Sequence, residues 1–255
     1  MIGVLVLLAQ AAAPAPFTIT LKGDYLTTQI TQAFKGTLID LESDRRKEGH
    51  LIKGGQVQFG PGLGNVHVQF SVPREKADLG WLGSVTYRLR DVHLRTLTAT
   101  ATGTNYLLEG RFDGKGPQIV GTHSSIGGVV PGVYMQNIRM QVWLTPLVDA
   151  TGRLTYGNVR THFASQMNTQ GLSFSMGGHR IDLLNSVTGY HKRIAQLVAD
   201  KLRETLEDPT NKATLSNYLN AALTEKAASM GAEVKALQVD GSDLKVTLQA
   251  KPAKI

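Results

Sequence analysis

The residue types that most often carry chemistry are sparse in this chain and do not fall at catalytic or metal-binding spacings. The 255 residues include seven histidines and no cysteine. No two histidines are two or four positions apart, which is how a strand or a helix presents a pair to one metal ion, and no acidic cluster accompanies them. The lack of cysteine excludes thiol catalysis, disulfides and an acylated-cysteine anchor. We therefore expect neither a metal nor an organic cofactor.

One serine lies in a partial nucleophile motif. The segment His123-Ser-Ser-Ile-Gly127 keeps the glycine two residues after Ser125, but histidine stands where the G-x-S-x-G elbow needs its first glycine. The glycine-rich residues 60–64 separate two strand-like segments and do not open a helix, so they are typical of a turn and not of a dinucleotide loop. An enzyme is not predicted. A hydrolase that uses Ser125 on lipid or polysaccharide is the alternative.

The chain is basic, with 27 Lys and Arg against 20 Asp and Glu and a formal net charge of +7. This balance favours anionic partners. The run of Arg45, Arg46 and Lys47 is bracketed by Asp44 and Glu48, so we interpret it as a solvated loop. A cleaner excess of cations between residues 139 and 193 is a candidate anion-attracting surface. Because the cations are not gathered into one arm, we expect peripheral contact with an anionic membrane surface and no nucleic-acid partner.

Residues 1–16 have the pattern of an export signal. An apolar run at residues 2–8 is followed by small residues, although no Lys or Arg precedes it. The run is too short to span a bilayer, which takes about 20 apolar residues. We therefore expect an exported, periplasmic or secreted protein in which residues 17–255 form a single domain.

Most of residues 17–176 follow the two-residue period of half-buried strands. A short helix over residues 24–34, capped by Asp24 and ended by Gly36, follows the first strand at 17–22. The later alternating segments are 56–59, 66–72, 85–89, 92–94, 97–101, 106–112, 135–144, 154–159 and 172–176, with a bend or bulge near 90–91. Short glycine-rich turns join them, which predicts a curved antiparallel meander. Residues 113–132 hold six glycines and two prolines, and are interpreted as a long surface hairpin or, alternatively, as a mobile lid.

From residue 182 the apolar period becomes 3.6, which predicts a long amphipathic helix over residues 183–206. Pro209 ends it, and a second helix carries apolar residues from 215 to 223. Two strands, 234–239 and 244–248, are joined by Asp240-Gly241, a strong hairpin signal. The predicted class is α+β: a long, strongly curved antiparallel meander wrapped against a long C-terminal amphipathic helix, with a short N-terminal helix and a closing C-terminal hairpin.

This order of elements resembles the tubular lipid-binding (TULIP) superfamily, in its single-module bacterial envelope type. The superfamily includes bactericidal/permeability-increasing protein. The resemblance is carried by residues 17–34, the strands between 57 and 176, the helix 183–206, and the ending 231–248. That ending has the form Val-x-x-Leu-x-Val-x-Gly-x-x-Leu-x-Val. The family is defined by architecture and has no invariant motif, so no binding residue is transferred by identity.

The resemblance implies an exported binder or carrier of lipid-like apolar ligands, held in a tube between the curved sheet and the long helix. The partner would be a lipid or another apolar small molecule. The residues expected to line the tube are Phe34, Met140, Val142, Val187, Ile194, Leu197 and Val198. Those expected to meet an anionic head group are Arg139, Arg160 and Lys192. The main alternative is a β-rich envelope interaction protein with a filled core that binds an acidic polymer or a protein partner.

Overall fold

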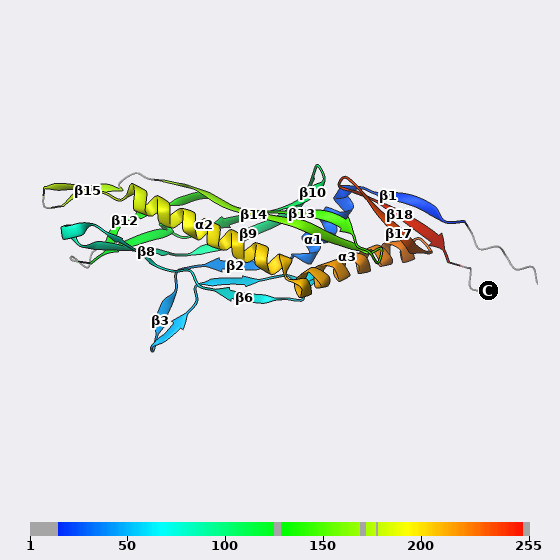
Figure 1. Cartoon of the computed structure of the whole chain (residues 1–255), viewed down its shortest axis with the longest axis horizontal. Helices are drawn as coiled ribbons and strands as arrows, with labels where there is room; N and C mark the ends of the chain where they lie inside the picture. The colour runs from blue at the N-terminus through cyan, green and yellow to red at the C-terminus, as the bar shows by residue number, and fades with distance from the viewer. Residues whose placement is uncertain (1–14, 125–128, 169–171, 177, 252–255) are drawn as a thin grey trace, which may run out of the picture.

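The protein is an elongated α+β molecule in which two helices follow one another along a curled antiparallel sheet (Figure 1). The computed structural model describes residues 15–124, 129–168, 172–176 and 178–251. Almost all of the predicted export signal, residues 1–16, lies outside the described residues. Ser125, the nucleophile of the hydrolase alternative, lies outside them too.

The largest sheet is antiparallel and follows the alternation of the sequence. Among the described residues it has seven strands in the order β14-β13-β10-β9-β2-β5-β6. Along β13, Met140, Val142 and Leu144 are buried while Arg139 is exposed, as the two-residue period predicts. The strand bounds are β2 Leu38–Leu41, β5 Gly55–Gln58, β6 His67–Phe70, β9 Val92–Thr102, β10 Asn105–Asp113, β13 Met135–Val148 and β14 Leu154–Met167.

A second sheet lies toward one end of the molecule, with its strands in the order β12-β11-β8-β7. Its strands are β7 Glu75–Asp78, β8 Ser84–Leu89, β11 Ile119–His123 and β12 Val129–Val133, and a separate hairpin pairs β15 Ser173–Met176 with β16 His179–Asp182. The chain leaves the second sheet for the first at the bend predicted near residues 90–91, where Asp91 has a φ of 46°. Because β11 pairs with β12, the segment 113–132 contains a hairpin, while a role as a lid stays a prediction.

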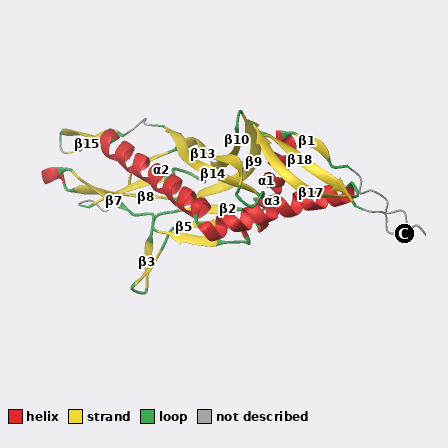
Figure 2. Ribbon diagram, turned by 45° about the vertical axis from the view of Figure 1, so that its right-hand side comes forward, coloured by secondary structure: helices red, strands yellow, loops and turns green. Residues whose placement is uncertain are grey.

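Two consecutive helices cover the open side of the curled sheet (Figure 2), α2 (Leu184–Glu207) and α3 (Pro209–Ser229). Helix α2 lies along β14, where Thr161 Oγ1 donates a hydrogen bond of 2.7 Å to the carbonyl of Ala199. Asp208-Pro209, which is predicted to end the first long helix, is also where α3 begins. The Asp208 carboxylate accepts from the N–H groups of Thr210 (2.9 Å) and Asn211 (3.1 Å), and proline suits the first helical position.

The closing hairpin returns to the beginning of the domain. Strands β17 (Ala232–Asp240) and β18 (Asp243–Ala250) form it, and β18 pairs with β1 (Phe17–Leu21). The first helix, α1 (Gly23–Ala33), corrects one prediction. Asp24 lies inside its first turn and does not cap it, because Asp243 Oδ1 accepts from the N–H of Gly23 at 3.0 Å. A residue 220 positions away thus supplies the cap, which local sequence could not indicate.

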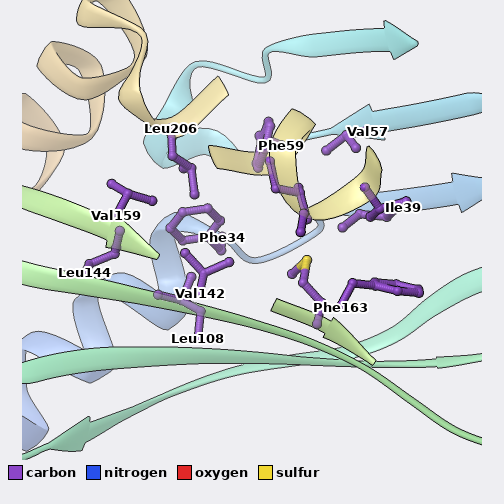
Figure 3. Packing of buried hydrophobic residues seen from close by; sticks show 14 of the residues in the cluster. Phe34, Ile39, Val57, Phe59, Leu108, Val142, Leu144, Val159, Phe163 and Leu206 are labelled. Atoms are coloured by element: carbon purple, nitrogen blue, oxygen red, sulfur yellow. The ribbon is translucent and has the colours of Figure 1, made fainter. Parts of the chain in front are cut away.

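Side chains from the sheet and the helices meet in one contiguous apolar core. Figure 3 shows Phe34, at the end of α1, between residues of β10, β13 and α2. Phe34 and Phe59 meet edge to face with their ring centroids 6.1 Å apart. The observed architecture confirms the predicted fold class.

A small hairpin projects from the body between β2 and β5 (Figures 1 and 2). Its strands are β3 (Arg45–Lys47) and β4 (His50–Ile52). The interpretation of residues 45–47 as a loop is wrong in its local structure, because these residues are paired in a strand. They are nevertheless exposed, as the charge pattern indicated.

Candidate functional site

A groove of about 500 Å³ runs along α2, where the helix faces the chain that connects β6 to β7. Helix α2 covers β14 on one side, and its other side contacts β8, Ser43 and this connection. The lining residues are Pro73, Arg74, Glu75, Tyr190, Arg193, Ile194, Gln196, Leu197 and Asp200. The groove is therefore the seam between the long helix and the segment 73–75.

The floor of the groove is apolar and contains one ordered phenol. Ile194 is buried and lies one helical turn after Tyr190. Leu197 is half-buried and lies one turn before Asp200 on the same helix. Tyr190 packs against Tyr87 with ring centroids 6.2 Å apart. The exposed part of the floor is chiefly Leu197, because Tyr190 and Ile194 are only 1% and 3% exposed.

A hydrogen-bonded network fixes Tyr190 at the seam. The phenol donates to the carbonyl of Pro73 (3.1 Å) and accepts from Ser43 Oγ (2.9 Å), which accepts in turn from the N–H of Leu89 (2.8 Å). Burial raises the pKa of Tyr190, so the phenol stays neutral and keeps its donor role. Tyr190 is therefore an anchor that holds the segment 73–75 against α2.

The rim of the groove is charged and balanced. Glu75 forms an ion pair with Arg193 across the seam, and Arg74 Nε donates to the carbonyl of Asp44 at 3.1 Å. Asp200 accepts from Gln196 at 3.0 Å on the same helix. Two arginines and two carboxylates line the rim, so it favours no particular sign of head-group charge. These groups can bind and orient a polar head.

The structure divides the predicted tube-lining residues into two sets. Ile194 and Leu197 line the groove. The other five lie in the apolar core on α1, β13 and α2: Phe34, Met140, Val142, Val187 and Val198. For all seven, contact with a ligand stays a prediction.

The predicted tube has little space in an interior pocket beneath α1 and α3. This pocket holds about 10 Å³ between α1, α3 and the strands β10, β13 and β14. It lies at the lower limit for a single water molecule, for which about 10–15 Å³ is needed. Room for an alkyl chain is present in the α2 groove and also in a groove of about 480 Å³ between the end of α1 and β9, which Phe34, Leu94 and Leu97 line.

The predicted head-group residues do not converge. Arg139 and Arg160 are exposed on the outer face of β13 and β14, where Arg160 lies over the ring of Trp143 at 5.8 Å. Lys192 is exposed on α2. No one of the three lines the groove, and their contact with an anion stays a prediction.

Sequence reasoning missed Tyr190, Arg74 and Glu75, while Arg193 belonged to the candidate anion-attracting stretch 139–193. A signal existed for Tyr190, because it continues the helical spacing from Val187 to Ile194. The short segment around Arg74 and Glu75 has no periodicity that would place it against a helix more than 100 residues away.

Within residues 15–124, 129–168, 172–176 and 178–251, no group of three His, Asp or Glu side chains could hold a metal ion. In the same part of the chain, neither α2, α3 nor any other helix combines the length and the apolar character needed to cross a membrane.

No family model and no curated protein matches this chain. A structure comparison found similarity to a crystal structure described as lipopolysaccharide binding protein, with 8% identity and a TM-score of 0.29. The match covers 71% of this chain and 45% of the other, so this chain spans less than half the length of that structure. A TM-score this low establishes neither a shared fold nor a shared ligand. The function has to be inferred from the geometry of the chain itself.

Proposed function

We propose that the protein is a non-enzymatic binder of lipid-like apolar molecules, which it holds in the groove between α2 and residues 73–75. The observation that carries the proposal is the apolar floor of Tyr190, Ile194 and Leu197 beneath a charged rim. Small-molecule sites are typically clefts of about 300–1,000 Å³ with apolar walls and a few polar groups, and a groove of about 500 Å³ fits this description.

The size of the groove indicates one alkyl chain. Each buried methylene contributes about 0.8 kcal/mol, so a segment of roughly eight methylenes would contribute on the order of 6 kcal/mol before the cost of immobilisation. This corresponds to a dissociation constant in the micromolar range or weaker. Tighter binding would require the Arg193–Glu75 ion pair to part and expose more of the floor.

The export pattern of residues 1–16 supports a place in the cell envelope, periplasmic or secreted, where a carrier of apolar molecules would meet membrane lipids. The groove opens on the side of the molecule, along the helix, so a chain could enter sideways without passing through the core.

The experiment is organic extraction of natively purified protein, followed by lipid mass spectrometry and displacement of a fluorescent acyl probe. We expect a co-purifying lipid and saturable probe binding in the micromolar range. Leu197→Glu places a carboxylate in the apolar floor and should weaken probe binding more than tenfold.

The matched control is Leu184→Glu, because Leu184 lies on the same helix, is 41% exposed and does not line the groove. It should leave probe binding unchanged. A clean extract together with no probe binding, or equal losses in the two variants, would contradict the proposal and favour a filled-core interaction protein.

A further inference from the structure

The projecting hairpin is an excursion from an otherwise continuous pair of strands. Leu41 of β2 is directly paired with Gly55 of β5, so residues 42–54 leave the sheet and return to it. Strands β3 and β4 pair from Arg45↔Ile52 to Lys47↔His50. Glu48 and Gly49 connect them with φ values of 51° and 82°, the pattern of a type I′ turn. Both views show the hairpin pointing away from the body (Figures 1 and 2).

The base of the hairpin is held in place by Asp44. Its Oδ1 accepts from the N–H groups of Gly54 (2.9 Å) and Val72 (2.8 Å), and its Oδ2 accepts from Ser71 Oγ. Burial would raise the pKa of Asp44, but the hydrogen bonds from Ser71, Val72 and Gly54 outweigh it and lower that pKa. The hairpin is therefore attached to β5 and to the end of β6 through a carboxylate that remains ionised.

The arms of the hairpin are strongly cationic. Residues 45–53 hold four Lys and Arg and one carboxylate, Glu48. Arg45 forms an ion pair with Glu42, with 3.8 Å between Nε and Oε1. Within the described residues, no carboxylate lies at ion-pair distance from Arg46, Lys47 or Lys53. All four cations are exposed, and so is the backbone turn that joins the two strands.

One face of the hairpin combines charge with exposed apolar surface. Leu51 is 59% exposed, the highest value among the leucines that are exposed. It is paired with Arg46, and directly paired residues of antiparallel strands point to the same face. Within the described residues, most of the Leu51 side chain beside Arg46 is left uncovered.

We propose that this hairpin, residues 45–53, docks the protein on a bilayer that contains anionic phospholipid. Each Lys or Arg near such a surface is attracted by its negative potential, and Leu51 can enter the boundary between head groups and acyl chains. The hairpin contains no Phe, Tyr or Trp on which successive bases could stack, which favours a lipid surface over single-stranded nucleic acid.

The hairpin adjoins the groove. The backbone carbonyl of Asp44, at the base of the hairpin, accepts a hydrogen bond from Arg74 on the groove rim. The neighbouring Ser43 is hydrogen-bonded to Tyr190 on the groove floor. Docking through the hairpin would therefore bring the groove close to the leaflet. The docking proposal goes beyond the proposed function and does not depend on the groove binding lipid.

The test is co-sedimentation of the full chain with vesicles of phosphatidylcholine, with and without phosphatidylglycerol. We expect binding only to the anionic vesicles, and its loss as salt is raised. The triple variant Arg45→Gln/Arg46→Gln/Lys47→Gln should lower the partition coefficient on the order of a hundredfold, and Leu51→Ser roughly tenfold.

The matched control is Lys35→Gln/Lys226→Gln/Lys251→Gln, which removes the same charge from exposed positions outside the hairpin. Equal losses in the two triple variants, or no binding of the wild type to anionic vesicles, would overturn the proposal. Hairpin-dependent binding to an acidic polymer without vesicle binding would overturn it in favour of a polymer partner. Binding of the fluorescent acyl probe in solution separates the docking proposal from the groove proposal. The hairpin variants should still bind the probe, whereas Leu197→Glu should still bind anionic vesicles.

Discussion

Helices α2 and α3 both turn apolar residues toward the body, but α2 is strongly amphipathic, α3 is not, and their surroundings differ. Helix α3 packs against α1, β14 and β17, and its Leu215, Leu219 and Leu223 are almost fully buried. Helix α2 is covered by β14 on one side, while its second side contacts Tyr87, Ser43 and the segment 73–75, and beside that segment a groove of about 500 Å³ remains. An apolar stripe becomes a binding surface where the fold supplies too little chain to cover it. The difference lies both in the helices themselves and in what each of them faces.

The largest expected effect is in the closed region. Leu215→Ala should lower the free energy of unfolding by about 2–5 kcal/mol, because Leu215 is fully buried and its neighbours cannot collapse into the space. Leu197→Ala, in the open groove, should cost less than about 1.5 kcal/mol because the side chain is already half-exposed. Urea unfolding of both variants measures the comparison. Similar losses would mean that the groove is packed as tightly as the α3 interface.

Two buried phenols allow the same comparison for hydrogen bonds. Tyr156 donates to the carbonyl of Leu206 at 2.7 Å, while Tyr190 donates to the carbonyl of Pro73 across the seam. Tyr156→Phe and Tyr190→Phe should each cost about 1–2 kcal/mol in the free energy of unfolding. Only Tyr190→Phe should also alter the affinity for the acyl probe. If Tyr156→Phe changed the affinity for the acyl probe as much as Tyr190→Phe does, the hydroxyl of Tyr190 would not act through the groove.

Acid should weaken the α2 side through His191. Burial, followed by the nearby charge of Lys192, lowers the pKa of His191, whose Nε2 is 2.6 Å from Ser165 Oγ. In the unfolded chain His191 has the ordinary histidine pKa of about 6.5, so below that pH the unfolded chain binds more protons at this residue than the folded chain does. The stabilisation from neutral His191 is present above that pH and is lost as the pH falls through the folded pKa. In thermal melts from pH 7 to pH 5, His191→Gln should show a shallower decrease in melting temperature than the wild type.

The smallest expected change in stability concerns the ion pair across the groove. Glu75→Gln should alter the free energy of unfolding by less than about 0.5 kcal/mol, because Arg193 is largely exposed and the pair is screened by solvent. The same variant should speed association of the acyl probe in stopped-flow measurements, since the seam is then easier to open. Lys201→Gln breaks another exposed pair on α2, with Glu204, outside the groove, and serves as the control. An unchanged association rate in Glu75→Gln would show that the ion pair does not gate the groove.

Local patterns were sufficient for most of the elements. The two-residue period of Met140 and Val142 indicates a half-buried strand, and the 3.6-residue stripe from Val187 to Leu206 indicates α2. Pro209 and the Asp240-Gly241 pair place the helix boundary and the closing turn. Each of these signals depends on residues within a few positions of one another, so the chain alone is enough to read them.

The candidate site needed the tertiary structure. Tyr190 and Pro73 are 117 positions apart, and nothing in either segment predicts that they meet. The sequence indicated the face of α2 that would be apolar, which includes Ile194 and Leu197 of the groove, but not which part of it would stay open. Likewise, charges at residues 45–47 were visible, while their projection on a hairpin depends on Leu41 pairing with Gly55. Periodicity determines which face of an element is apolar, whereas the packing of distant segments determines how much of that face is covered.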